Sequence, residues 1–260
     1  MLSILKYRRL IWRRALADVR YRYAGTSAGI FWNLLQPLSF ITIYAVVFSG
    51  LMGARLPQLP GRFGYTIYLC SGMIPWIALS DCIMRGCTAF LTNAQYLKKL
   101  DIPESVFVAE TSVSAGITLL ISFVLLTVVA VSFGYFPTLY WLLLPIPLAA
   151  LVIVGFSIGL ICGTLNVFFR DLGQIVPIGL QIIMWSVPIV YVPTILPAWV
   201  QSMLPWHPLT PAIQAVRDLF VFGQMPGVEL WIAMIAWPTA GIVVAFTLLR
   251  KLQDEVRDLI

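Results

Sequence analysis

The sequence from Ser112 to Phe169 reads SVSAGITLLISFVLLTVVAVSFGYFPTLYWLLLPIPLAALVIVGFSIGLICGTLNVFF and contains no charged residue. A helix needs about 20 apolar residues to cross the hydrocarbon core of a bilayer, so this stretch is too long for one helix. The motif Gly134-Tyr135-Phe136-Pro137 is typical of a turn and divides the stretch in two. The stretch therefore predicts two transmembrane helices, at residues 112–133 and 142–169.

Four more apolar segments outside this pair reach the length of a membrane span. They are residues 28–52, 65–91, 175–192 and 230–249. The composition agrees, because 60% of the residues are hydrophobic and 11% are charged, with a mean hydropathy of +0.91. A soluble domain needs more charge to cover its surface. We predict an all-α integral membrane protein, a single domain of residues 1–260 with six transmembrane helices.

Lys and Arg divide unequally between the two sides that six helices define. Fourteen of the 17 fall on the side of the termini, and only Arg55, Arg62 and Arg217 fall on the other side. Positive residues favour the cytoplasmic side of a membrane. We therefore expect a multi-pass protein of the bacterial inner membrane with both termini in the cytoplasm, including the tail at residues 250–260.

The N-terminal segment, residues 1–26, is basic and amphipathic. At about 100° per residue, one side of a helix carries Leu5, Trp12, Leu16, Val19 and Tyr23, and the opposite side carries Lys6, Arg9, Arg13 and Arg20. This pattern predicts a helix that lies on the anionic cytoplasmic leaflet. Two roles remain open: a topology anchor, or guidance of an anionic lipid headgroup such as a pyrophosphate by Arg9, Arg13 and Arg20.

Residues 193–227 are rich in proline but remain apolar. They predict two short helices, one from Pro197 and one from Thr210-Pro211 that stops near Gly223. Each is too short to span the bilayer, so we expect a re-entrant or interfacial hairpin on the outer side. His207 is the only histidine, and we interpret it as a turn or interface residue. We predict no metal site and no catalytic residues; the cysteines are interpreted as core residues without disulfides.

Short motifs along nearly the whole chain carry a family resemblance. They are Gly72-Met73-Ile74-Pro75-Trp76, Asn93-Ala94-Gln95-Tyr96-Leu97-Lys98-Lys99, Ile102-Pro103-Glu104, Phe169-Arg170-Asp171 with Gln174, and the single residues Pro188, Tyr191, Pro197, Pro208 and Arg217. In this order they resemble the permease subunits of type-2 ATP-binding-cassette exporters for polysaccharides, O antigen, capsule and teichoic acid. One departure is His207, where the family usually has Asn.

The resemblance implies a homodimeric permease with six helices per subunit, paired with two copies of a separate nucleotide-binding ATPase subunit. The implied cargo is a glycan carried on a polyprenyl diphosphate lipid. The chain has no GxxxxGK[ST] phosphate loop. We therefore expect no enzyme activity and no cofactor on this chain, with ATP and Mg²⁺ on the partner. We expect no nucleic-acid partner.

Residues 93–101 form the first substantial cytoplasmic loop. Asn93 is suited to cap a short helix there. The resemblance makes this the helix that couples to the ATPase, with Tyr96 and Leu97 as apolar anchors and Lys98 and Lys99 as a charged rim. The alternative is an ordinary basic loop of the cytoplasmic side.

Two helix faces combine amides with aromatic rings. One carries Asn33, Gln36, Phe40, Tyr44 and Phe48, and the other Gln174, Gln181, Trp185 and Pro188. Such side chains suit sugars, because rings stack on C–H faces and amides bond to hydroxyls. We predict a substrate channel from the first face with Gln181 and Trp185, although the same residues could equally hold helices together.

Three further features are interpreted first as structural rather than as substrate contacts. Gly155, Gly159 and Gly163 form a GxxxG ladder, which predicts close helix packing. Asp81 and Arg85 stand four residues apart and predict a structural ion pair or a wet vestibule rather than a proton relay. Glu110 is interpreted as an interfacial carboxylate, with a gate or an interhelical partner as alternatives.

Two other functions would each require acidic residues in a particular arrangement. A membrane transferase acting on polyprenyl lipids needs clustered acids for Mg²⁺-bound diphosphate, and the acids here are scattered. An ion-coupled carrier needs midplane carboxylates and internal repeats, which the sequence lacks. An exporter of a drug or small lipid, of the same permease type, stays open. The sequence does not say which glycan is carried.

Overall fold

The computed structural model describes residues 2–53, 59, 61–100 and 102–259, which form helices and no strand. In chain order the elements are α1 (Leu2–Lys6), α2 (Arg8–Tyr21), η1 (Gly29–Phe31), α3 (Trp32–Tyr44), the π-helix η2 (Ala45–Leu51), α4 (Gly64–Thr92), α5 (Ala94–Lys99), α6 (Ser105–Ser132), η3 (Leu139–Leu143), α7 (Pro145–Phe168), α8 (Leu172–Ser186), η4 (Pro193–Ile195), α9 (Ala198–Met203), η5 (Leu204–Trp206), α10 (Thr210–Phe220) and α11 (Val228–Leu259). Arg55 and Asp101 lie outside the described residues.

Within the described residues, five helical segments are long and apolar enough to cross a membrane. They are Gly29–Leu51, Gly64–Thr92, Ser105–Ser132, Leu139–Phe168 and Val228–Leu259. The predicted fifth span, residues 175–192, forms the shorter apolar helix α8 and then leaves helical geometry. The predicted tail at 250–260 continues α11 as helix through Leu259. Five long spans are therefore present among the described residues, and the expected count of six depends on the shorter helix α8.

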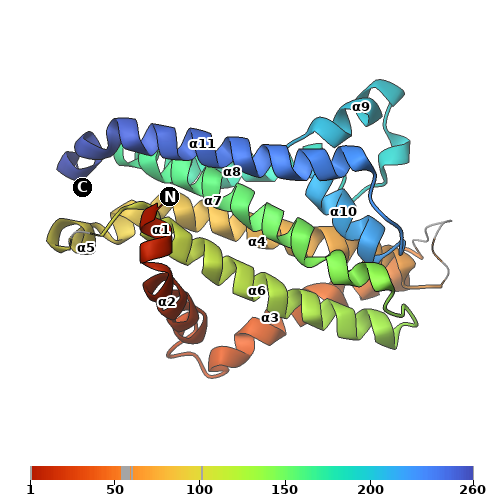
Figure 1. Ribbon diagram of the computed structural model, residues 1–260. Helices are drawn as coiled ribbons and strands as arrows, with labels where there is room; N and C mark the ends of the chain where they lie inside the picture. The colour runs from red at the N-terminus through yellow and green to blue at the C-terminus, as the bar shows by residue number, and fades with distance from the viewer. Residues whose placement is uncertain (1, 54–58, 60, 101, 260) are drawn as a thin grey trace.

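The helices are arranged as an elongated bundle with two distinct ends (Figure 1). Both chain termini and α5 lie at one end, which we call the termini end. The short helices α9 and α10 lie at the other, the hairpin end, and α8 leads towards them from the termini end. Because the termini share an end, the chain crosses the bundle's length an even number of times.

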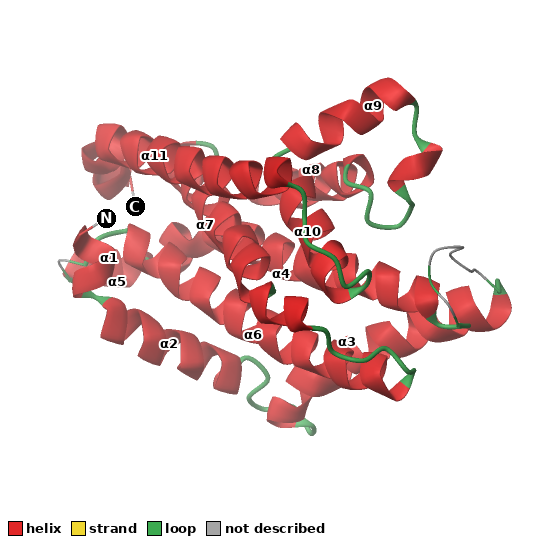
Figure 2. Cartoon of the chain, turned by 45° about the vertical axis from the view of Figure 1, so that its right-hand side comes forward, coloured by secondary structure: helices red, strands yellow, loops and turns green. Residues whose placement is uncertain are grey.

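The centre of the bundle is α4, which is buried along most of its length against α6 and α7 (Figure 2). Glycines permit the close approach of α7. A Cβ atom on Gly163 would lie 2.6 Å from the carbonyl oxygen of Gly86, and one on Gly155 would lie 3.0 Å from Cys82 Sγ. Gly159 lies against the backbone of Cys82 and Gly86. The GxxxG ladder is therefore in contact with backbone of α4 as well as with side chains.

The segment after α8 holds four consecutive backbone carbonyls, which we call the carbonyl run 188–191. Those of Pro188 and Ile189 accept hydrogen bonds from Arg217 of α10, that of Val190 from Tyr65 and that of Tyr191 from Tyr68 of α4. Arg217 is fully buried, and its guanidinium lies 3.8 Å from the centroid of the Tyr68 ring. Side chains thus replace the helical partners that these carbonyls lack.

Space for this guanidinium depends on a glycine. A Cβ atom on Gly72 would lie 2.8 Å from Arg217 Nη2. Gly72, the first residue of the Gly72–Trp76 motif, is therefore needed to leave room for the Arg217 side chain. At the same end, His207 Nδ1 accepts a hydrogen bond from the backbone amide of Leu209 at 3.3 Å, as expected of a turn residue.

The N-terminal helix α2 packs on α6 through one face. Ile11, Ala15 and Val19 are buried there, whereas Leu5 and Trp12 are exposed. The residues predicted to form one apolar side of this helix therefore do not all face the same way. Val19 faces the bundle and Trp12 faces away from it. An exposed Trp at the edge of a bundle suits contact with lipid.

Candidate functional site

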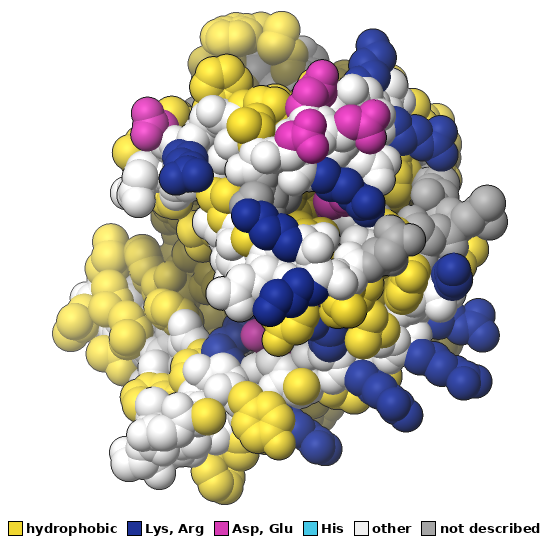
Figure 3. Space-filling model, turned by 90° about the vertical axis from the view of Figure 1, so that its left-hand side faces the viewer, with side chains coloured by type: hydrophobic (Ala, Val, Ile, Leu, Met, Phe, Trp, Pro, Cys, Tyr) yellow, Lys and Arg dark blue, Asp and Glu magenta, His cyan; other side chains and the backbone are white. Residues whose placement is uncertain are grey.

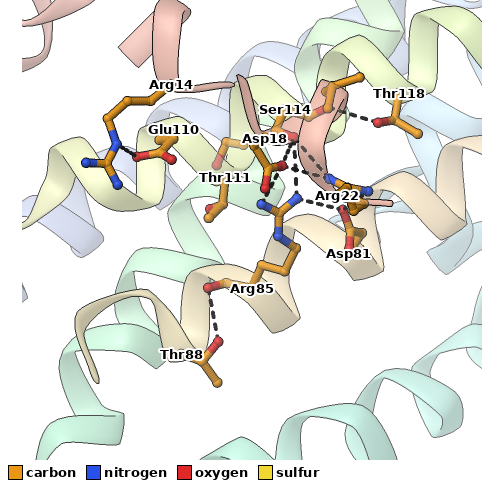
Figure 4. A network of polar contacts seen from close by, with 12 residues as sticks. Arg14, Asp18, Arg22, Asp81, Arg85, Thr88, Glu110, Thr111, Ser114 and Thr118 are labelled. Carbon is orange, nitrogen blue, oxygen red and sulfur yellow. Dashed lines mark hydrogen bonds and ion pairs between the residues drawn. The ribbon is translucent and has the colours of Figure 1, made fainter. Parts of the chain in front are cut away.

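A network of charged side chains joins α2 to α4 and α6, with Asp18 at its centre (Figure 4). Arg85 Nη2 lies 2.8 Å from Asp18 Oδ2, and Arg22 Nη2 lies 3.1 Å from the same oxygen. Ser114 Oγ donates a hydrogen bond to it as well. The network forms because Asp18 and Arg22 are four residues apart on one face of α2, and that face lies against α6.

Asp81 closes the network on α4. It lies 3.4 Å from Arg85 Nη1 and 3.7 Å from Arg22 Nη1. The predicted Asp81–Arg85 ion pair is therefore present, but as part of a group of two carboxylates and two guanidinium groups. Their formal charges cancel, and their side chains are 23–30% exposed.

The pKa of Asp18 lies below its ordinary value. Burial of the carboxyl acts to raise this pKa, but the hydrogen bond from Ser114 and the charges of Arg85 and Arg22 outweigh burial. A lowered folded-state pKa means that ionised Asp18 stabilises the fold above the unfolded value of about 3.9. That contribution is lost as the pH falls through the lower folded-state pKa. At neutral pH the network is fully ionised at this position.

A second contact links α2 to the segment around α5. Arg14 Nε lies 2.5 Å from Glu110 Oε2, and Arg14 Nη2 donates to Asn93 Oδ1 at 3.2 Å. The guanidinium also lies 5.2 Å from the ring centroid of Tyr96. Glu110 is therefore an interhelical partner, and Arg14 contacts Asn93 and Tyr96 of the predicted coupling segment.

Arg14, Asp18, Arg22 and Ser114 are not among the residues predicted from the sequence. A signal for three of them is present, because Arg14, Asp18 and Arg22 recur at intervals of four residues and so share one helix face. The predicted basic face comprises Arg9, Arg13 and Arg20 instead. These three are exposed on α2, and Lys and Arg side chains gather over the termini end (Figure 3).

Replacing Asp18 by Asn is expected to loosen α2. The change leaves Arg22 and Arg85 without their shared carboxylate, at a cost of about 1–2 kcal/mol, which corresponds to roughly tenfold faster opening. Hydrogen exchange of the amides in Arg8–Tyr21 measures this. Asp254→Asn, on an exposed residue of α11, is the matched control. Equal exchange in both variants would show that the network does not hold α2.

A cavity of about 270 Å³ lies beside this network, between the end of α2, α3, α4 and α6. Its polar lining comes from Arg22, Tyr23, Asn33, Gln36, Asp81, Thr118 and Ser122, and its apolar lining includes Phe40. Asn33 is buried and donates to the backbone carbonyl of Val19 at 3.1 Å. Gln36 accepts a hydrogen bond from Tyr23 at 2.9 Å. The amides therefore line the cavity and also hold α2 against α3.

The other predicted channel residues lie in two different places. Tyr44 and Phe48 continue the face of Phe40 towards the hairpin end, with ring centroids 6.4 Å and 6.2 Å apart in succession. Gln181 and Trp185 are exposed on α8, which packs on α4 and α7. The single chain does not bring them to the cavity.

The predicted coupling residues differ in exposure. Tyr96, Lys98 and Lys99 of α5 are exposed, whereas Leu97 packs against the buried cluster that includes Phe107. Leu97 therefore anchors α5 to the bundle. The apolar side chains exposed on the outer face are those of Tyr96 and Leu100, the latter 47% exposed. Asn93 occupies the N-cap position of α5 as predicted, but its side chain makes no capping hydrogen bond. It donates instead to the carbonyl of Ala89 in the preceding helix at 2.9 Å.

No group of three His, Cys, Asp or Glu residues in the described part of the chain could hold a metal ion. The four cysteines are unpaired thiols.

The long apolar helices and the basic termini end are typical of a multi-pass membrane protein, and the polar cavity gives it a candidate binding site. The chain belongs to the ABC-2 type transporter family, which matches residues 7–221. The resemblance drawn from the motifs is thereby confirmed, and the chain is a transporter membrane component.

Several curated proteins are similar to this chain. An O-antigen export system permease protein RfbA of Klebsiella pneumoniae is 31% identical over 80% of this chain and 78% of the relative. A protein of the same description from Myxococcus xanthus is 24% identical over 97% and 96%. The polysialic acid transport protein KpsM of Escherichia coli is 23% identical over 88% and 89%.

Proposed function

We propose that this chain is the transmembrane subunit of an ATP-driven exporter that moves a lipid-linked polysaccharide across the bacterial inner membrane. The observation that carries the proposal is the similarity to an O-antigen export permease over nearly the full length of both chains. ATP hydrolysis takes place on a separate nucleotide-binding subunit, present in two copies beside two copies of this chain. The termini end faces the cytoplasm.

Six crossings of the membrane follow if α8 counts as a span. Its 15 residues extend about 22 Å at 1.5 Å per residue, short of the roughly 30 Å hydrocarbon core. The carbonyl run 188–191 follows directly, and its hydrogen bonds to Arg217, Tyr65 and Tyr68 allow non-helical backbone to lie at membrane depth. The two parts together are long enough to cross.

The arginines divide into two groups with different roles in this proposal. Arg22 and Arg85 are neutralised by Asp18 and Asp81, so they hold α2 in place. Arg9, Arg13 and Arg20 are exposed and are free to attract a diphosphate headgroup to the membrane surface. The glycan then enters the cavity lined by Asn33, Gln36 and Phe40, whose amides and ring suit sugars. Gln181 and Trp185 contribute from a second copy of the chain.

Deleting the gene tests the cargo. We expect lipid-linked glycan to accumulate on the cytoplasmic leaflet and surface polysaccharide to disappear, with both restored by the wild-type gene. Intact surface polysaccharide without accumulation would refute the proposal.

Coupling to the ATPase is proposed to occur through α5, and replacing Tyr96 by Asp is expected to release the partner. The change puts a charge at the centre of an exposed apolar contact while leaving the partly buried Leu97 intact. Co-purification of the ATPase with tagged permease should fall about tenfold or more, as expected for loss of a central interface aromatic.

The matched control is Tyr21→Asp, because Tyr21 is 70% exposed on α2 and lies outside α5. It should leave co-purification unchanged. Equal recovery of the ATPase with Tyr96→Asp and with wild type would remove α5 as the docking helix.

A further inference from the structure

A second cavity, of about 390 Å³, lies at the hairpin end. It is formed by α4, the segment after the carbonyl run, α10 and the turn that follows α10. Its lining residues are Tyr68, Val192, Pro193, Thr194, Gln214, Asp218, Phe222 and Gln224. The sequence analysis assigned no role to Asp218 or to the two glutamines.

Among the described residues that line this cavity, Asp218 is the only charged one. It is 7% exposed, and its Oδ1 accepts hydrogen bonds from the side-chain amides of Gln214 at 3.0 Å and Gln224 at 3.4 Å. The neighbouring Arg217 directs its guanidinium to the carbonyl run instead. Among the described residues, Asp218 therefore has no ion-pair partner, and none of them donates a hydrogen bond to its Oδ2.

Aromatic rings flank this carboxylate. Tyr68 and Phe222 meet edge to face, with centroids 6.3 Å apart and planes at 62°. The same rings end a continuous series that starts at the first cavity. In order it comprises Phe40, Tyr44, Phe48, Tyr65, Tyr68 and Phe222, with successive centroids 5.4–6.4 Å apart. A run of neighbouring aromatic rings therefore extends from the lining of the first cavity to the lining of the second.

We propose that the hairpin-end cavity is a binding site for sugar units of the glycan as they leave the transporter, and that it favours neutral or amino sugars over acidic ones. This inference rests on the proposed export of a polysaccharide. A carboxylate oxygen and two amides offer acceptors and donors for ring hydroxyls, and the partly exposed ring of Phe222 offers apolar surface for C–H faces. The unpaired negative charge of Asp218 attracts an ammonium group and repels a carboxylate.

The lining excludes a metal ion as the occupant. A single carboxylate with two amide side chains gives fewer hard oxygen ligands than Ca²⁺ requires, and the amides already donate to that carboxylate.

The test measures binding of soluble sugars to the full-length permease, held with its ATPase in lipid nanodiscs. The probes are neutral hexasaccharides of glucose, mannose and galactose, and a hexamer of galacturonic acid. Wild type should bind at least one neutral probe more tightly than the acidic one. Asp218→Asn should weaken the neutral probe about tenfold, through loss of a charge-assisted hydrogen bond, and should strengthen the acidic probe. A purely structural role of Asp218 would weaken both.

A second variant avoids the buried carboxylate. Gln224 is exposed, so Gln224→Ala should fold normally and should weaken the neutral probe severalfold. The matched control is Gln201→Ala on α9, also exposed at the hairpin end, which should bind as wild type does. The proposal is overturned if wild type binds none of the neutral probes, if it prefers the acidic probe, or if Gln224→Ala and Gln201→Ala bind equally.

Transport assays separate this proposal from the proposed function. ATP-driven movement of lipid-linked glycan in vesicles, without any binding of the neutral probes, overturns the sugar site and leaves the exporter intact. Saturable neutral-probe binding that Asp218→Asn weakens supports the site whatever the transport assay gives.

Discussion

Replacing Arg217 by Met should lower the melting temperature of the purified permease by roughly 6–24 °C. The guanidinium is fully buried and serves the carbonyls of Pro188 and Ile189. Methionine fills much of the volume but donates no hydrogen bond, so two buried carbonyls lose their partners. Hydrogen bonds to a charged group contribute about 1.5–3 kcal/mol each, and each kcal/mol shifts the Tm of a chain this size by about 2–4 °C.

The change should also act locally, at the hairpin end. With the carbonyl run 188–191 released, protease cleavage between α8 and α10 should accelerate before the rest of the chain unfolds. Arg217→Lys should recover only part of the stability, because one ammonium group cannot match a two-pronged guanidinium stacked on Tyr68. Arg250→Met, on an exposed arginine of α11, is the matched control. A Tm equal to that of Arg250→Met would mean that the hydrogen bonds of Arg217 to the carbonyl run contribute nothing to stability.

Replacing Gly163 by Ala should destabilise the bundle, while the same replacement at Gly179 should not. A methyl group at Gly163 would lie 2.6 Å from the carbonyl oxygen of Gly86, and nothing lies within 4 Å of the corresponding position at Gly179. Both glycines are within helices. Overpacking costs about 1–3 kcal/mol, whereas Gly to Ala in an open helical position gains up to about 1 kcal/mol.

Thermal unfolding of the two variants, each compared with wild type, measures this difference. A shift of opposite sign for Gly163→Ala and Gly179→Ala is expected, because backbone of α4 cannot move aside as a flexible side chain would. Equal Tm values would contradict the view that α4 and α7 meet through their backbones. Gly86→Ala offers an independent check from the other helix, since its methyl group would lie 2.8 Å from Gly159 Cα.

The candidate site was only partly predictable from the sequence. Asp81 and Arg85 were paired correctly, because four residues on one helix fix their distance. Their further partners Asp18 and Arg22 were missed, since the contact joins segments more than 50 positions apart. Leu97 was predicted to be an apolar anchor on the docking surface of α5, but it is partly buried against the bundle. A helix of six residues has too few turns for the spacing of its apolar residues to show which side is buried.

The sequence by itself determined that this protein is a multi-pass membrane protein. Long apolar segments must be covered by lipid or protein, and that requirement is local to each segment. Only the tertiary structure decided which polar groups meet: the neutral network around Asp18, the guanidinium of Arg217 on the carbonyl run, and the separation of Asn33 and Gln36 from Gln181 and Trp185. Helices of equal hydrophobicity can pack in many arrangements in a membrane, and close backbone contacts and buried hydrogen bonds select one of them.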